Sequence, residues 1–110
     1  MEITISGRHI DITEAIRAYA SAKAAMIAQA KVLSREVGIY NVRVNIIAPG
    51  LTDTDMMKKS TPEEILNEVT SKTSLKRIAN PEEIANVALS LSSDLSSHIT
   101  GQVIRVDGGM

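Results

Sequence analysis

Tyr19 and Lys23 are the two residues of this chain whose types and spacing best suit chemistry. Four residues apart on a helix, their side chains share one face. An ammonium group beside a phenol favours the phenolate, and so lowers a phenol pKa that starts near ~10. Such a phenol could protonate a carbonyl oxygen as hydride reaches the carbon, or deprotonate an alcohol in the reverse direction. The same spacing also occurs where a half-buried tyrosine simply lies beside a snorkelling lysine.

Ser6 stands at the end of a predicted strand, at the edge where α/β sheets place their ligands. Its hydroxyl could hydrogen-bond a substrate carbonyl and hold it for the tyrosine. The alternative is that Ser6 only helps the chain turn at Ser6-Gly7.

The positions of these residues depend on alternating strands and helices. Apolar patterning predicts three parallel strands at about 2–6, 42–48 and 102–106, with helices at about 13–37, 62–71 and 81–92. The first helix starts at Thr13 or after Asp11 and stops at Gly38. Thr61-Pro62 and Asn80-Pro81 each predict a helix start, with the first residue as cap and proline in the first turn. Residues 51–60 are expected to form a loop or a broken helical stretch.

Composition limits the class of protein. A chain of 110 residues, 44% hydrophobic, fits one domain over 1–110. The net charge of −1 gives no basis for nucleic acid or an anionic membrane as partner. Cysteine is absent and the two histidines, His9 and His98, are far apart, so we predict no metal site. No signal peptide and no run of ~20 apolar residues is present, so we expect a cytoplasmic protein.

A series of motifs resembles the carboxy-terminal half of the short-chain dehydrogenase/reductase family, closest to the 3-oxoacyl-(acyl-carrier-protein) reductases. The motifs are Tyr19-Ala-Ser-Ala-Lys-Ala-Ala-Met26, Asn41-Val-Arg-Val-Asn-Ile-Ile-Ala-Pro-Gly50, Leu51-Thr-Asp-Thr-Asp-Met56, Leu75-Lys-Arg-Ile-Ala-Asn-Pro-Glu-Glu-Ile-Ala85 and Ile99-Thr-Gly-Gln-Val-Ile-Arg-Val-Asp-Gly-Gly-Met110. They follow one another in order over about four fifths of the chain. The resemblance implies a partial Rossmann-like α/β fold of three layers.

The resemblance also implies roles for individual residues. Tyr19 would be the catalytic acid, and Lys23 would bind the nicotinamide ribose of NADP or NAD. Ser6, thirteen residues before Tyr19, matches the offset of the family's catalytic serine. Cofactor contacts are implied for backbone at Pro49, Gly50 and Thr52 and for the Thr54 hydroxyl. The implied activity is reduction of a 3-oxoacyl thioester.

The chain departs from the family in its glycines. Family members are about twice as long and carry a Gly-x-x-x-Gly-x-Gly turn, which brings backbone N–H groups against the pyrophosphate. The glycines here fall at 7, 38, 50, 101, 108 and 109, and none forms that turn. We therefore expect this chain alone to bind the cofactor poorly and to be inactive. A scaffold lacking flanking strands is expected to form a homo-oligomer, through an exposed sheet edge or the 13–37 helix.

Residues 1–20 also resemble the start of ribosome hibernation promoting factors, which open with a strand, a Gly-Arg/Lys-His/Asn turn and a helix. This resemblance rests on the segment that runs from Met1 through Gly7-Arg-His-Ile-Asp-Ile-Thr-Glu to Ala20. It implies a fusion with a joint near residues 18–20, a coincidental Ser6, and ribosome binding as a remote alternative function.

Overall fold

Two short parallel strands lie at the centre of the fold, β1 (Ile46–Pro49) and β2 (Val103–Val106). The structure, a computed structural model, describes residues 12–110. In the ladder Ile46 pairs with Val103 and Pro49 with Val106. The parallel pairing predicted from the alternation of strands and helices is confirmed for these two strands. The predicted strand at 2–6, with Ser6, lies outside the described residues.

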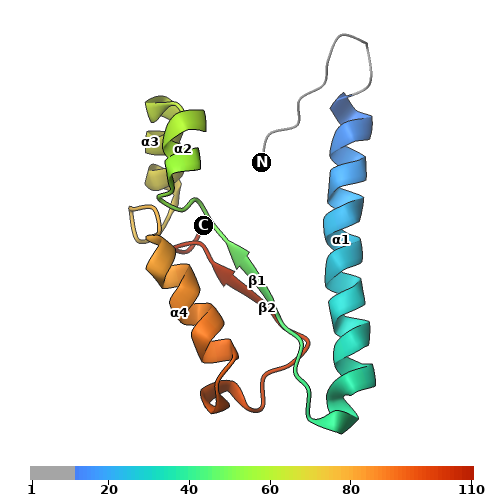
Figure 1. Cartoon of the computed structure of the whole chain (residues 1–110). Coiled ribbons are helices and arrows are strands. Elements are labelled where there is room, and N and C mark those ends of the chain that lie inside the picture. The colour runs from blue at the N-terminus through green and yellow to red at the C-terminus, as the bar shows by residue number, and fades with distance from the viewer. Residues whose placement is uncertain (1–11) are drawn as a thin grey trace.

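Helices flank the two strands on both sides (Figure 1), so the predicted α/β class is confirmed. The 26-residue helix α1 (Ile12–Val37) stands on one side, and α4 (Pro81–Leu91) lies on the other, against β1. Between β1 and α4 the chain forms α2 (Asp55–Ser60) and α3 (Glu63–Lys72). Two short 3-10 turns, η1 (Gly38–Tyr40) and η2 (Asp94–Ser96), follow α1 and α4.

The helices predicted at 13–37, 62–71 and 81–92 each agree with the structure to within one residue at either end. Gly38 follows the last residue of α1, as predicted. Asn80 is the N-cap of α4 with Pro81 in its first turn, which confirms that helix start.

The strand predicted from residue 42 begins only at Ile46, because the preceding residues bond to a loop instead of a strand. Val44 N–H donates to Thr100 Oγ1 at 3.0 Å, and Gly101 N–H donates to the Val44 carbonyl at 2.7 Å. Both polar groups of the Asn45 amide are engaged by the same loop, at Gln102 N–H and the Ile99 carbonyl. The ladder therefore starts after these side-chain bonds end.

After β1, one prediction was left open between two alternatives and one was wrong. Of the loop or broken helical stretch expected over 51–60, residues 55–60 form the helix α2, because Thr54 caps it and the Thr61 N–H closes it on the Met57 carbonyl at 2.9 Å. Thr61 is therefore the end of α2 and not the cap of the next helix. Pro62, with an extended ψ of 149°, is the N-cap of α3.

Burial in this fold is shallow. Met57, 8% exposed, is the one buried hydrophobic side chain among the residues described. The radius of gyration is 16.9 Å, above the roughly 13 Å of a compact domain of this size. Along α1, Met26, Val32 and Leu33 are exposed. None of the described helices combines the length and apolar character needed to cross a bilayer.

The carboxyl end of α1 is held by a close contact between Ser34 and Gly101. Ser34 is buried, and its hydroxyl donates to the Lys31 carbonyl at 2.7 Å. Gly101 has φ +69°, and a Cβ placed there would lie 2.8 Å from Ser34 Oγ. Only glycine fits both the left-handed backbone and the space.

We expect Gly101→Ala to destabilise the fold by about 1–3 kcal/mol, from the left-handed φ and the clash with Ser34 together. Chemical denaturation followed by circular dichroism measures this change. Gly38→Ala is the matched control, because a Cβ there meets nothing within 4 Å, and we expect a change of about 0.5 kcal/mol or less. Equal effects of the two substitutions would contradict the role given to Gly101.

Candidate functional site

The turn after β1 carries the four residues predicted to contact a nicotinamide: Pro49, Gly50, Thr52 and Thr54. The Gly50 N–H donates to the Val106 carbonyl at 2.9 Å, so the turn leaves the sheet while still attached to β2. A Cβ on Gly50 would lie 2.8 Å from the Cα of Asp107. Backbone therefore packs directly on backbone at this point, which only glycine permits.

Ala79 holds the other flank of the same turn. Ala79 N–H donates to the Leu51 carbonyl at 3.1 Å, and Asp53 N–H donates to the Ala79 carbonyl at 2.8 Å. These bonds form an isolated parallel bridge between Thr52 and Ala79. In a parallel pair the bonds come from the residues on either side of the bridged one, so the N–H and C=O of Thr52 itself point away from Ala79.

Thr54 has a structural task that was not predicted. Its Oγ1 accepts a hydrogen bond from the Met57 N–H at 3.1 Å and so caps α2. A hydroxyl that accepts one bond keeps its own hydrogen for a second partner. Capping is thus compatible with the predicted contact between Thr54 and a cofactor. Threonine followed by aspartate is a common helix start, and was the available signal.

An open groove of about 890 Å³ lies beside this turn. Gly50, Thr52 and Thr54 line one part of it, and the rest is largely apolar. The apolar lining consists of Leu51, Met56, Met57, Pro62 and Ile65. The groove joins the polar turn to a surface suited to a hydrocarbon chain.

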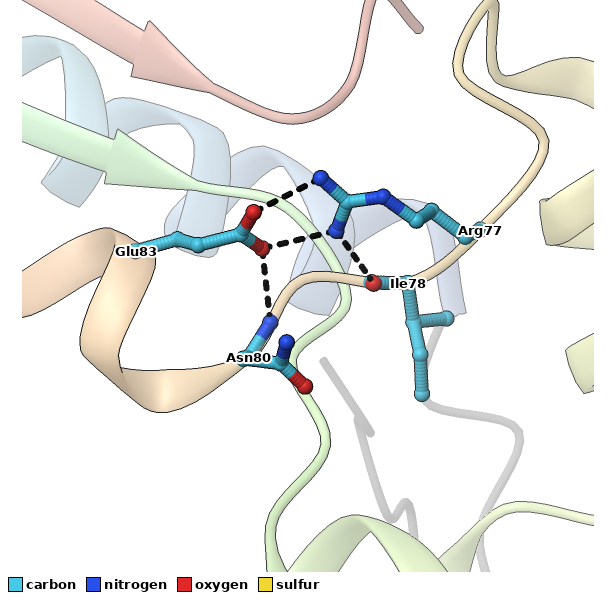
Figure 2. Close-up of polar contacts among 4 residues, drawn as sticks. All are labelled: Arg77, Ile78, Asn80 and Glu83. Carbon is cyan, nitrogen blue, oxygen red and sulfur yellow. Dashed lines mark hydrogen bonds and ion pairs between the residues drawn. The ribbon is translucent and has the colours of Figure 1, made fainter.

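Arg77 and Glu83 form an ion pair beside the backbone of Ile78 and Asn80 (Figure 2). The two guanidinium nitrogens bind the two carboxylate oxygens at 2.8 and 2.6 Å. Glu83 Oε2 also accepts from the Asn80 N–H at 2.9 Å, and Arg77 Nη1 donates to the Ile78 carbonyl at 3.4 Å. The backbone on either side of Ala79 is therefore bound by one salt bridge.

The chain end is tied to the same region through Asp107. Asp107 pairs with Arg105 at 2.7 Å, and its Oδ1 accepts from the N–H groups of Gly109 and Met110. The bond from Gly109 is the main reason that the pKa of Asp107 lies below its usual range. A charged Asp107 thus orders the segment that touches Gly50.

Tyr19 and Lys23 both lie on α1, four residues apart. The half of α1 that carries them stands at the same end of the molecule as the carboxyl ends of β1 and β2 (Figure 1). Lys23 has an exposed side chain. The hydrogen bonds that Thr52 and Thr54 make in the structure stay within the turn and α2, at Gly50, Met57 and Lys58. The structure therefore places the part of α1 that carries the pair and the turn after β1 at one end of the molecule. Ser6 lies outside the described residues.

Parallel strands between helices, with a polar turn at the carboxyl ends of the strands, define an α/β protein, and α/β proteins generally bind their ligands at that edge. The family described as enoyl-(acyl carrier protein) reductase matches residues 2–110. The chain belongs to the short-chain dehydrogenase/reductase family.

Individual relatives agree with this assignment. The 3-oxoacyl-[acyl-carrier-protein] reductase of Chlamydia trachomatis is 56% identical over 92 residues, which cover 84% of this chain and 37% of the relative. A crystal structure of the 3-oxoacyl-[acyl-carrier protein] reductase of Brucella melitensis matches with a TM-score of 0.78 at 41% identity, over 84% of this chain and 34% of that one. A second structure from Brucella melitensis, with bound NAD, matches with a TM-score of 0.71 at 41% identity, over 84% and 32%.

These matches establish the kind of protein. Relatives are oxidoreductases, and family members use a nicotinamide cofactor. This chain spans about 37% of the length of the curated relatives it matches. The family match includes residues 2–20, and the comparisons give no support to a relation with ribosome hibernation factors.

Arg77, Ala79, Glu83 and Asp107 were given no individual role from the sequence. Ala79 acts through its backbone, which its side chain does not reveal. Glu83, three residues after a helix cap, carries the usual signal of a capping box. No sequence signal connects Arg77 to it.

The salt bridge with Arg77, followed by the Asn80 N–H, lowers the pKa of Glu83 from 4.5 to about 2. A carboxylate with a depressed folded-state pKa adds stability above its ordinary pKa, and that stability is lost as the pH falls through the folded-state value. We expect the Glu83 carboxyl carbon to titrate near pH 2 by NMR, and Arg77→Met to move the midpoint up towards 4.5. An unchanged midpoint in the variant would show that Arg77 is not the cause.

Proposed function

We propose that this chain carries the catalytic pair and the nicotinamide-binding turn of an NAD(P)H-dependent oxidoreductase that reduces a 3-oxoacyl thioester. Family membership and the 3-oxoacyl reductases among its relatives support the substrate class. A cytoplasmic location and a single domain over 1–110 stay predictions from the sequence.

The observation that carries the proposal is the free backbone edge of Thr52. Its N–H and C=O point away from Ala79, as one strand presents its edge to the next. A carboxamide has one acceptor and two donors, so it can pair with both groups. The Thr54 hydroxyl adds a donor on the same turn. The Thr52 N–H, the Thr52 C=O and the Thr54 hydroxyl together therefore fit the carboxamide of a nicotinamide ring.

Pro49 and Gly50 complete the proposed contact. Proline has no N–H, so Pro49 can offer a ligand only its carbonyl group, beside the backbone edge of Thr52. The close packing of Gly50 on Asp107 keeps this backbone in place. When bound, a reduced nicotinamide supplies the hydride for the carbonyl carbon.

The residues of α1 supply the proton. Tyr19 donates its phenolic proton to the carbonyl oxygen, and Lys23 keeps the phenolate accessible by its positive charge while binding the ribose hydroxyls. Ser6 holds the substrate carbonyl by a hydrogen bond. The apolar part of the groove at Met56, Met57 and Ile65 accepts the acyl chain.

Titration with nicotinamide mononucleotide tests the proposal. We expect amide shifts in the NMR spectrum at Thr52 and Thr54, because the carboxamide pairs with that edge. Adenosine monophosphate is the matched control, since it has the sugar and phosphate but no carboxamide, and we expect it to leave both signals in place. Shifts elsewhere, or none, would contradict the assignment of the turn.

The 110-residue chain alone should not oxidise NADPH in the presence of an acetoacetyl thioester. None of its glycines forms the turn that holds a pyrophosphate, so most of the cofactor lacks contacts. Absorbance at the NADPH band measures this. Clear turnover would overturn the expectation of inactivity, and its loss in Tyr19→Phe would then still support the catalytic pair.

Self-association is a second candidate property, and the exposed apolar residues of α1 favour it. Met26, Val32 and Leu33 are 62%, 52% and 45% exposed. Apolar side chains gathered on one helix mark an interaction surface. We propose that a second copy covers them, with the exposed edge of the two-stranded sheet as the alternative contact.

Light scattering at micromolar concentration tests self-association, and we expect a mass at least twice that of the chain. Leu33→Lys should shift the mass towards the monomer, because it places a charge on the proposed contact. Leu89→Lys, at an exposed leucine of α4, is the control and should leave the mass unchanged. A monomeric mass for the unmodified chain would contradict the proposal.

A further inference from the structure

The turn at residues 50–54, or Thr52 turn, is attached to a different kind of structure on each of its two sides. On the side of β2, its backbone is fixed by the sheet, through the Gly50 N–H bond to Val106 and the close contact with Asp107. On the other side two hydrogen bonds attach it to Ala79, at 3.1 and 2.8 Å, while Thr54 is bonded to α2. Ala79 lies in no strand and no helix. What holds Ala79 therefore helps to set where the Thr52 edge points.

The side chain of Ala79 does not fix the position of its backbone. Its side chain is one methyl group, which offers no polar contact. The residues on either side are bound instead. The Ile78 carbonyl accepts from Arg77, and the Asn80 N–H donates to Glu83 at 2.9 Å. Because Arg77 and Glu83 bind each other through both oxygens, the two ends of the Ile78–Asn80 segment are joined (Figure 2).

The partners of the salt bridge are themselves anchored. Glu83 is in the first turn of α4, where a carboxylate is also favoured by the helix N-terminus. Arg77 follows a turn whose backbone is bound to the chain end, with the Leu75 N–H donating to the Gly108 carbonyl at 3.0 Å. The ion pair thus joins α4 to the segment at Leu75, which is bound to Gly108, and Ala79 lies between Arg77 and α4 in the sequence.

We propose that Arg77 and Glu83 are positioning residues that hold Ala79, and through it the backbone edge of Thr52, in the orientation that pairs with a carboxamide. The proposal rests on the proposed function for the identity of the ligand. Neither side chain lines the groove beside Thr52, so both act on the Thr52 edge indirectly, through the backbone that they hold.

Amide hydrogen exchange is the test that does not depend on activity. In Arg77→Met we expect the Asp53 and Ala79 N–H groups, which carry the bridge, to exchange about three to ten times faster. The Ile46 and Gly50 N–H groups, bonded to Gln102 and Val106, should exchange as before. Arg77→Lys keeps the positive charge but loses the two-pronged guanidinium contact. Its bridge amides should therefore exchange at a rate between those of the unmodified chain and of Arg77→Met. If Arg77→Met does not fold, Glu83→Gln removes the same ion pair from the other side, and we expect the same faster exchange of the Asp53 and Ala79 N–H groups.

Lys72→Met is the matched control. It breaks a second exposed ion pair, with Glu68 at 2.6 Å, which has no part in the bridge. Bridge amides that exchange equally fast in Arg77→Met and in the unmodified chain would overturn the proposal. A gain of the same size in Lys72→Met would also overturn it, since the effect would then be general destabilisation.

Binding of nicotinamide mononucleotide completes the test. We expect its dissociation constant to rise about threefold in Arg77→Met and to stay unchanged in Lys72→Met. Faster exchange with unchanged binding would overturn the positioning role. Absence of binding to the unmodified chain would count against the proposed function, and the exchange rates would then decide separately whether the ion pair holds the turn.

Discussion

The parallel pairing of β1 with β2 is the constraint on which the rest of the structure depends. Because the strands run in the same direction, both carboxyl ends leave the sheet at one edge, and the turn after Pro49 meets the segment after Val106 there. The Gly50 N–H continues the ladder by one bond beyond the strands. Every contact proposed for the nicotinamide ring lies within five residues of that bond. The ladder is only four pairs long, yet it sets the site.

The geometry of the site is held by backbone bonds and ion pairs more than by a core. Met57 is the one buried hydrophobic side chain among the described residues, and the carboxyl end of α1 is held where Ser34 meets Gly101. A large apolar core would tolerate the loss of one polar contact. Here single contacts such as the bridge at Ala79 have few neighbours that could replace them.

The sequence predicted the parts that depend on periodicity and on helix caps. The three long helices, β2 and the Asn80 cap follow from apolar spacing and local residue preference. The start of β1 could not be obtained this way, because it is decided by side-chain bonds from Thr100 and Asn45 to backbone. For α2 the sequence left a loop and a broken helical stretch open, and the bond from the Met57 N–H to Thr54 decides for the helix. In the candidate site, cofactor contacts of Thr52 and Thr54 were predicted from the resemblance and stay predictions. Ala79 was not, since a residue that acts through its backbone has no signature in its side chain.

The packing of Gly50 on Asp107 has a mechanical consequence. Elsewhere in a protein, side chains lie between two segments, and a small shift of one is absorbed by a change of rotamer. At this contact a single Cβ would already be too close, at 2.8 Å from the Cα of Asp107. The two backbones form a joint with no rotamers to take up strain. A displacement of the turn is consequently expected to carry the segment after Val106 with it.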